Sequence, residues 1–348
     1  MLDYLSEAQA VALFGLLGGF ALGLAARLGR FCTLGAIEDI LYGGDDRRLR
    51  MWGIAIGAAV ISAHAAMALG WIAPTETAYV AQAWNPLASV IGGLLFGYGM
   101  ALSGNCGYGA LARLGGGDFR SLVIVAVMGV SAYAVMSGPF AHLRVALFPV
   151  EMADTPQSIS LRLSAMTGAA PWLFGAVIGI VILGFSVIGA RLPLTPRHWL
   201  WGAVVGLAIT SGWIGTQWVS VNGFVGDTPR THTFAAPIGE TIIYLMTASG
   251  TSLSFGVGSI FGVVGGAALG SLVKREFRWE ACDDTRELRR QIFGAVLMGT
   301  GAILAVGCSV GQGISAFSML AYGAPLTLVM IFVGAATGLK QLIVGYSV

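Results

Sequence analysis

The chain has 348 residues, of which 56% are hydrophobic and only 10% are charged, and its formal net charge is +2. A soluble domain carries about a quarter of charged residues, so this composition excludes an ordinary soluble globular protein. The small net charge gives no indication of a nucleic-acid partner. Apolar runs of a length that crosses about 30 Å of hydrocarbon recur along the chain, without the alternation of barrel strands, and they predict spanning α-helices.

In chain order, residues 1–10 contain Asp3 and Glu7 but no Lys or Arg. The basic start of a cleavable signal peptide is therefore missing, and we expect the first apolar run to be a spanning helix. The predicted spanning helices lie near 9–30, 51–73, 87–104, 119–137, 170–190, 198–218, 253–272, 291–307 and 325–343.

Shorter apolar stretches follow some of these segments, at 32–42, 106–114, 238–248 and 309–321. They are too short to span a bilayer. We interpret them as re-entrant half-helices, which occur at membrane depth where they line a cavity or are buried in protein. The alternative is that they lie at the interface or belong to kinked helices. The predicted fold is thus an all-α integral membrane protein with about nine spanning and about four short re-entrant helices.

Lys and Arg are distributed very unevenly between the two sides of this arrangement. If the N-terminus is outside, fifteen of them fall in inner loops, Lys340 falls in the last helix, and three arginines (Arg144, Arg162 and Arg230) fall outside. This bias predicts an outer N-terminus and an inner C-terminus. We expect one membrane domain over 1–348, with a first half at 1–138, an outer connection at 139–169 and a second half at 170–348.

Three of the four cysteines share one sequence frame. Cys32, Cys106 and Cys308 each have glycines at offsets −14, −9 and +3, and each lies where a long helix gives way to a short one. The helices before Cys32 and Cys106 run inward, whereas the helix before Cys308 runs outward, so the pattern predicts an inverted pseudo-two-fold repeat. A fourth copy without a cysteine is expected at Gly202, Gly206, Ser211, Gly212 and Trp213.

A cysteine at the start of a helix has a definite chemistry. Unpaired N–H groups and the positive end of the helix dipole attract anions there. A thiol is a weak donor that suits a large, polarisable sulfur acceptor better than a hard oxygen. The spaced thiols therefore favour a path that passes a small sulfur-containing anion by weak binding at several places.

The structural alternative for a single membrane cysteine is a small residue in a helix contact. The shared frame argues against this for the three repeat cysteines, but Cys282, in a charged inner loop, keeps it. The glycines three residues after each cysteine (Gly35, Gly109 and Gly311) are expected beside the path. Other candidate path residues are Asn105, Ser309 and Gln312, whose side chains adjoin the cysteines and can hydrogen-bond to an oxyanion.

At these motifs the chain resembles the YeeE/YedE family of sulfur transport proteins. The matching stretches are Gly29-Arg-Phe-Cys-Thr-Leu-Gly-Ala36, Ser103-Gly-Asn-Cys-Gly-Tyr-Gly-Ala110 with Leu114-Gly-Gly-Gly-Asp118, and Gly307-Cys-Ser-Val-Gly-Gln-Gly-Ile314. The resemblance implies thiosulfate uptake across a bacterial inner membrane by an hourglass of nine spanning and four short helices. It further implies that Cys32, Cys106 and Cys308 relay thiosulfate through S–H contacts, beside a TusA-like cytoplasmic sulfur carrier.

Two alternatives share this architecture. Some family members are proposed to move other sulfur or selenium species, and this chain departs from the family in its long 139–169 connection and in Asn105. The competing class is a membrane sulfurtransferase in which a cysteine forms a persulfide. The chain has no C-x-x-C pair and no cluster of metal-ligand type, so we expect no metal, no cofactor and no enzyme activity.

Overall fold

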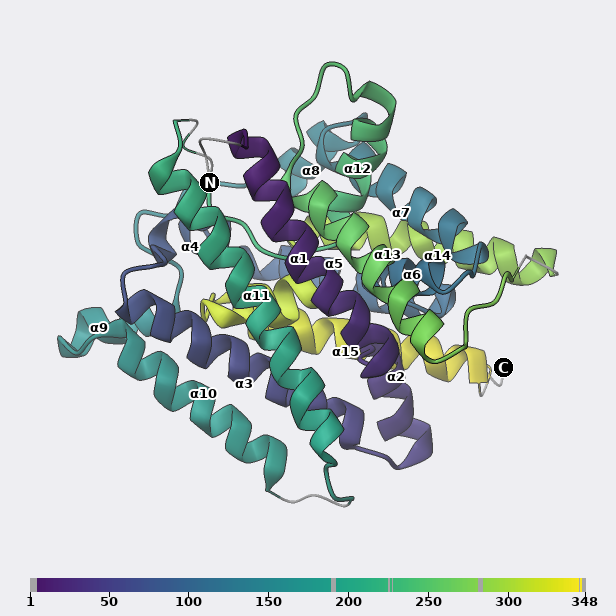
Figure 1. Cartoon of the computed structure of the whole chain (residues 1–348), viewed down its shortest axis with the longest axis horizontal. Helices are drawn as coiled ribbons and strands as arrows, with labels where there is room; N and C mark the ends of the chain where they lie inside the picture. The colour runs from purple at the N-terminus through teal and green to yellow at the C-terminus, as the bar shows by residue number, and fades with distance from the viewer. Residues whose placement is uncertain are drawn as a thin grey trace.

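The computed structural model describes residues 5–188, 192–224, 226, 228–280, 284–343 and 345. Over these residues the chain is helical and contains no strand, which confirms the predicted all-α class. Figure 1 shows long helices that run across the molecule and shorter ones among them. The long helices are α1 (Glu7–Leu28), α3 (Arg47–Ala68), α5 (Pro86–Ser103), α7 (Arg120–Met136), α10 (Pro171–Val187), α11 (Pro196–Asn222), α13 (Phe255–Val273), α14 (Thr285–Leu304) and α15 (Gly323–Ile343).

Each of the nine predicted apolar segments thus overlaps one long helix, and the ends differ by a few residues. By length and hydropathy, six helical spans of the described chain qualify as membrane spans, and a seventh qualifies if α7 and α8 (Ala141–Leu147) form one bent span. Of the remaining long helices, α10 has only 17 residues, and α14 begins with charged residues from Arg286 to Arg290. The structure therefore bears out an all-helical membrane protein, whereas the number of spans stays a prediction.

The short segments also form helices. They are α2 (Thr33–Glu38) with the π-helical turn η1 (Asp39–Gly43), α6 (Gly107–Gly115), α12 (Ala235–Thr247) and the π-helical segment η3 (Gly311–Ala316). The connections contain η2 (Pro74–Glu76), α4 (Ala78–Ala81), α8 and α9 (Ile159–Thr167). Because π turns are rare and concentrate at functional sites, η1 and η3 already point to the cysteine-containing segments.

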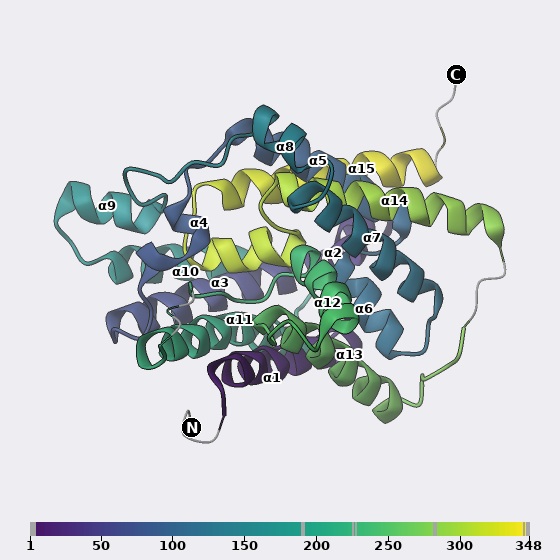
Figure 2. The same ribbon diagram turned by 90° about the horizontal axis from the view of Figure 1, so that it is seen from above.

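Helix ends follow the local sequence. Ser6 caps α1 in a capping box with Gln9, and Asn85 caps α5, whose first residue is Pro86. Both arrangements satisfy N–H groups that a helix start leaves without partners. Small residues then let the helices approach closely: Gly15, Gly19 and Gly23 of α1 lie directly against the backbone of α13. Figures 1 and 2 show these two helices side by side.

The helix pairing has an internal symmetry. Six helical segments of the first half correspond to six of the second half, and exchanging the two sets preserves the main contacts. In order, the first set is α1, α2, α3, α5, α6 and α7, and the second set is α11, α12, α13, α14, η3 and α15. Thus α1 packs on α13 as α11 packs on α3, and α5 packs on α15 as α14 packs on α7. The partners α1 and α11 run antiparallel, because Phe14 lies at Gly215 while Trp201 lies at Gly29. This is the inverted arrangement that the cysteine frame predicts.

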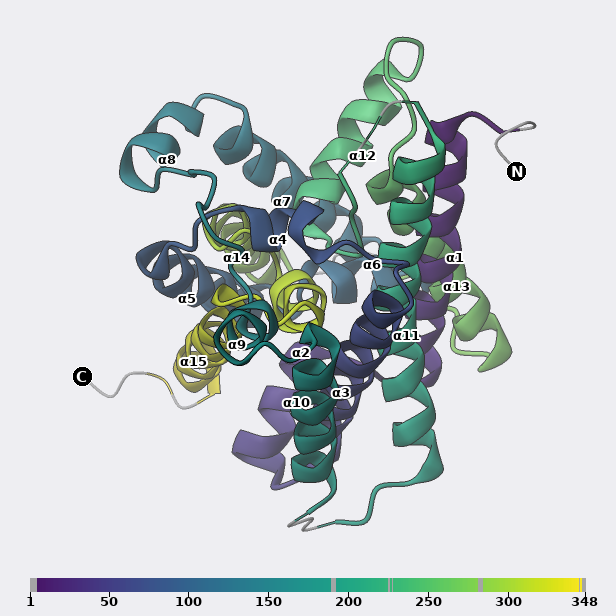
Figure 3. The same ribbon diagram turned by 90° about the vertical axis from the view of Figure 1, so that its left-hand side faces the viewer.

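The second half differs from the cysteine frame in two ways. The predicted remnant of the fourth copy, Gly202 to Trp213, lies within α11, which runs without interruption from Pro196 to Asn222. The fourth short helix is α12, whose N-cap residue Phe234 makes no side-chain capping bond. In addition, α10 packs on α3 and α9 and has no counterpart in the exchange. Figure 3 shows α10 against α3 at the edge of the molecule.

Candidate functional site

The three repeat cysteines cap the short segments with their sulfur atoms. The Cys32 Sγ accepts the backbone N–H of Gly35 at 3.5 Å, and the Cys106 Sγ accepts that of Gly109 at 3.4 Å. The Cys308 Sγ accepts the Gly311 N–H at 3.4 Å. The glycine at offset +3 in the sequence is therefore the residue whose N–H the thiol caps, as a serine would at an ordinary helix start.

The breaks before the cysteines also share a backbone conformation. The residue two positions before each cysteine is left-handed: Arg30 has φ 57°, Gly104 has φ 73° and Val306 has φ 55°. Only glycine adopts this conformation cheaply, and a β-branched valine there is a genuine outlier. The chain thus accepts strain at two of the breaks to turn each cysteine into position, which is typical of functional sites.

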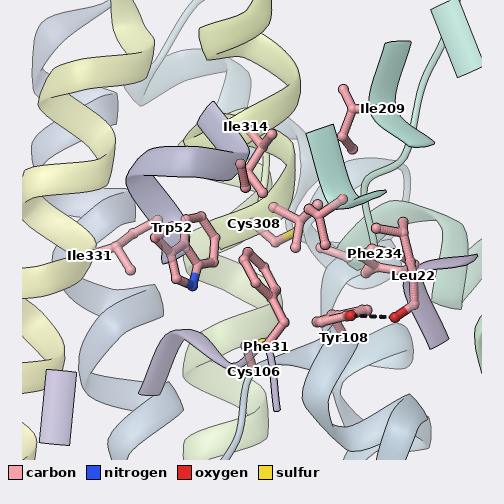
Figure 4. Close-up of a cluster of buried hydrophobic side chains, with 14 of the residues drawn as sticks. Leu22, Phe31, Trp52, Cys106, Tyr108, Ile209, Phe234, Cys308, Ile314 and Ile331 are labelled. Carbon is pink, nitrogen blue, oxygen red and sulfur yellow. Dashed lines mark hydrogen bonds between the residues drawn. The ribbon is translucent and has the colours of Figure 1, made fainter. Parts of the chain in front are cut away.

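The thiols come together in the centre of the molecule. Cys106 and Cys308 are 1% and 2% exposed and belong to one core cluster, against which the half-buried Cys32 packs. Figure 4 shows Cys106 and Cys308 from different segments, with Phe31 drawn between them. Phe31 stacks on Trp52 at a centroid distance of 4.8 Å and meets the edge of Tyr108 at 6.5 Å. Aromatic side chains therefore fill the space around the thiols.

Hydroxyl groups connect these segments. The Thr33 hydroxyl donates to the Ser309 Oγ at 3.1 Å, which links the Cys32 helix to the Cys308 segment. On the other side, the Thr233 Oγ1 lies 3.7 Å from the Cys308 Sγ. The sequence pattern predicts Ser309 as a path residue, whereas no motif in the sequence marks Thr33 or Thr233.

The two candidate amides behave differently. Asn105 is 3% exposed, and its Nδ2 has no hydrogen-bond partner among the described residues. Such an unsatisfied buried donor is costly, and a bound acceptor would remove the cost. The Gln312 Nε2 instead donates to the carbonyls of Ala305 and Val306, at 2.8 Å and 3.1 Å. Gln312 therefore holds the strained turn before Cys308, while its Oε1 has no hydrogen-bond partner in the part of the chain that the structure describes.

The three candidate glycines have different surroundings. A Cβ on Gly35 would meet the guanidinium of Arg48, which also pairs with Asp39 at 3.1 Å. A Cβ on Gly109 would meet only the Asn105 side chain, at 3.3 Å or more. A Cβ on Gly311 would lie 2.5 Å from the Thr233 Oγ1 and 3.2 Å from the Tyr79 hydroxyl. The three glycines therefore differ in the room that an added side chain would find.

A hollow leads toward the Cys308 end of this cluster. It has a volume of about 730 Å³ and shares Arg230 and Phe255 with a second hollow, which Glu7 at the start of α1 also lines. Arg230 lines its wall, and Tyr79 and Thr233 also line it. A neighbouring hollow of about 320 Å³ also has Tyr79 and Thr233 in its wall, together with Arg144 and Gly307, the residue before Cys308.

Cys282, the cysteine without the glycine frame, lies outside the residues that the structure describes.

Comparison with known proteins decides the family. The sequence model of the sulphur transport family matches residues 28–337, which contain all three repeat cysteines. The chain belongs to the sulphur transport family. It is similar to the thiosulfate transporter TsuA of Escherichia coli (strain K12), with 27% identity over 341 residues and 93% of each chain covered. It is also similar to the thiosulfate transporter TsuA of Spirochaeta thermophila, with 25% identity over 331 residues, 92% of this chain and 96% of the relative.

Proposed function

We propose that this chain takes up thiosulfate across a bacterial inner membrane through a relay of Cys32, Cys106 and Cys308. The observation that carries the proposal is the convergence of three thiols, each on a glycine N–H at the start of a short segment, from positions far apart in the chain. Thiols donate weakly and suit a polarisable sulfur. Several weak sites in series bind an anion without trapping it, which transport requires.

The surroundings suggest an order of contacts. Thr233 lines the hollow and lies beside Cys308, so Cys308 is the first thiol that an anion from this side would reach. Ser309 follows Cys308 and, through Thr33, connects this segment to the helix that Cys32 caps, while Cys106 lies in the same core cluster as Cys308. With the N-terminus outside, as the Lys and Arg distribution favours, the hollow faces outward. Cys32 is then the release end.

The polar candidates fit this path in different ways. Asn105 offers a free N–H beside Cys106, which suits an oxygen of the sulfonate end. Gly35, Gly109, Gly311, Ser309 and Gln312 border or support the thiols. We include delivery to a TusA-like sulfur carrier on the inner side, because Cys32 is the most exposed of the three thiols. The proposed process is transport without covalent chemistry.

The experiment is growth of a sulfur-auxotrophic bacterium on thiosulfate as its only sulfur source, with and without this gene. Growth that depends on the gene is expected. Growth that depends on the gene with another sulfur or selenium source, and not with thiosulfate, would assign a different cargo. Mass spectrometry of protein purified with thiosulfate tests the relay: unmodified Cys106 and Cys308 are expected, whereas a stable sulfur adduct would favour the sulfurtransferase alternative.

A further inference from the structure

Tyr79 stands out at the floor of the outer hollows, although no sequence motif contains it. It lines three neighbouring hollows at once, together with Gln82 and Val306. Its hydroxyl faces that of Thr233, and both lie over Gly311, where a Cβ would be 3.2 Å from the Tyr79 Oη. Because the Thr233 Oγ1 is also 3.7 Å from the Cys308 Sγ, two hydroxyls and one thiol meet at one point.

From this arrangement we propose that Tyr79 and Thr233 bind the oxygen end of the incoming anion while the Cys308 thiol binds its terminal sulfur. This assignment rests on the proposed function and adds the residues that read the two ends of the substrate. Hydroxyl hydrogens rotate to suit an acceptor, so the Tyr79 and Thr233 hydroxyls can both turn toward sulfonate oxygens. The softer thiol then contacts the atom that distinguishes thiosulfate from sulfate.

Both hydroxyl residues are held in place before any anion arrives. The ring of Tyr79 packs edge-on against Trp213 at 6.2 Å, and the Trp213 indole N–H donates to the Ser318 Oγ at 3.0 Å. Tyr79 lies in the short helix α4, and the 139–169 connection holds this helix in place, because the Gln157 N–H donates to the Val80 carbonyl at 2.9 Å. This long connection thus fixes the position of Tyr79 across the hollow. A preorganised site binds without the cost of ordering its groups.

The segment of Thr233 is equally fixed. The Thr231 hydroxyl donates to the Ile209 carbonyl at 2.6 Å, and the Ser315 hydroxyl donates to the His232 carbonyl at 2.6 Å. The second bond joins this segment to η3, three residues after Gln312. The Thr233 Oγ1 is therefore held at a set distance from Cys308 by contacts that do not involve the substrate.

The charges around the floor favour weak binding of an anion. Arg230 and Arg144 line the walls of the hollows, and two carboxylates, Glu76 and Glu240, line the larger one. The carboxylates accept hydrogen bonds, Glu76 from Gln217 at 2.9 Å and Glu240 from Ser254 at 3.3 Å. Neutral donors at the floor and mixed charges on the walls attract an anion without holding it tightly.

The test is a comparison of thiosulfate and sulfate binding to the purified full chain in detergent, measured by isothermal titration. Tyr79→Phe and Thr233→Val should each weaken the binding of both ions on the order of tenfold, because each removes a donor to oxygen. Cys308→Ser should weaken thiosulfate binding and leave sulfate binding within about twofold. Thr233→Ser, which keeps the hydroxyl, should bind both ions like the unaltered protein.

Tyr98→Phe and Thr337→Val are matched controls, since their hydroxyls donate to Gln341 and to the Gly334 carbonyl and neither residue lines the three hollows. Unaltered binding by Tyr79→Phe and Thr233→Val would overturn the assignment, as would equal loss of both ions in Cys308→Ser. Failure of the unaltered protein to bind sulfate would also overturn it. The variants could show the expected binding pattern while the unaltered protein fails to take up thiosulfate in proteoliposomes. That result would contradict the proposed function but not the assignment of the binding residues.

Discussion

Replacing Gly311 by alanine tests whether the Cys308 segment borders the substrate path. In an exposed helix this change stabilises by about 1 kcal/mol, because alanine loses less conformational freedom than glycine. At Gly311 the new Cβ would lie 2.5 Å from the Thr233 Oγ1 and 3.1 Å from the Thr233 Cβ. Overpacking of this kind costs about 1–3 kcal/mol. The sum is a destabilisation of about 0–2 kcal/mol, accompanied by displacement of the Thr233 hydroxyl from Cys308.

Gly109→Ala is the matched control in the pseudo-equivalent position. Its Cβ would lie 3.3 Å from the Asn105 Oδ1, a tight contact that a shift of a few tenths of an ångström in that side chain relieves, so most of the helix-propensity gain should survive. The assay is thermal stability in detergent together with uptake of labelled thiosulfate, normalised to monodisperse protein. Gly311→Ala should lower both quantities, and Gly109→Ala should raise stability and keep more of the uptake. Equal stability and equal uptake in the two variants would refute this account of the contact with Thr233.

Further substitutions probe the amide, the strained turn and the orientation. Asn105→Leu should leave the amount of folded protein unchanged and reduce thiosulfate uptake, since it removes a buried donor that lacks a protein partner; undiminished uptake would place Asn105 outside the path. Val306→Gly should raise the free energy of unfolding by about 1 kcal/mol by relieving the left-handed conformation, and a lower thermal midpoint would speak against strain there. In a Cys282→Ser background, a membrane-impermeant thiol reagent should label Glu76→Cys in intact cells and Asp284→Cys only after permeabilisation; the reverse pattern would invert the proposed topology.

The parts of the fold that follow local rules could be predicted from the sequence. The apolar segments become the long helices because each is long enough to satisfy its own backbone hydrogen bonds. The cysteine frame could be detected because one geometry, a sulfur on the N–H three residues later, recurs at Cys32, Cys106 and Cys308. The Lys and Arg distribution also predicts the direction in which each helix crosses the membrane, and this direction stays a prediction. These features predicted the inverted pairing that α1 and α11 show.

The rest depends on contacts between distant segments. Tyr79 and Thr233 lie outside the repeat frame, and nothing local to either residue places it beside Cys308. The predicted short segment 238–248 begins three residues after α12 does, because the N-cap residue Phe234 has no capping side chain that would mark the start. The left-handed backbone conformation of Arg30 and Val306 could not be predicted from the sequence either, because Arg and Val ordinarily avoid that conformation.

The most direct test of the relay is thiosulfate uptake by proteoliposomes that contain purified Cys106→Ser or Cys308→Ser protein. A hydroxyl is a shorter and harder partner than a thiol, so it should cap the same glycine N–H but bind the terminal sulfur poorly. The account predicts that both variants stay folded and monodisperse and lose uptake, while Cys282→Ser transports like the unaltered protein. Full uptake by both Cys106→Ser and Cys308→Ser would contradict the central claim.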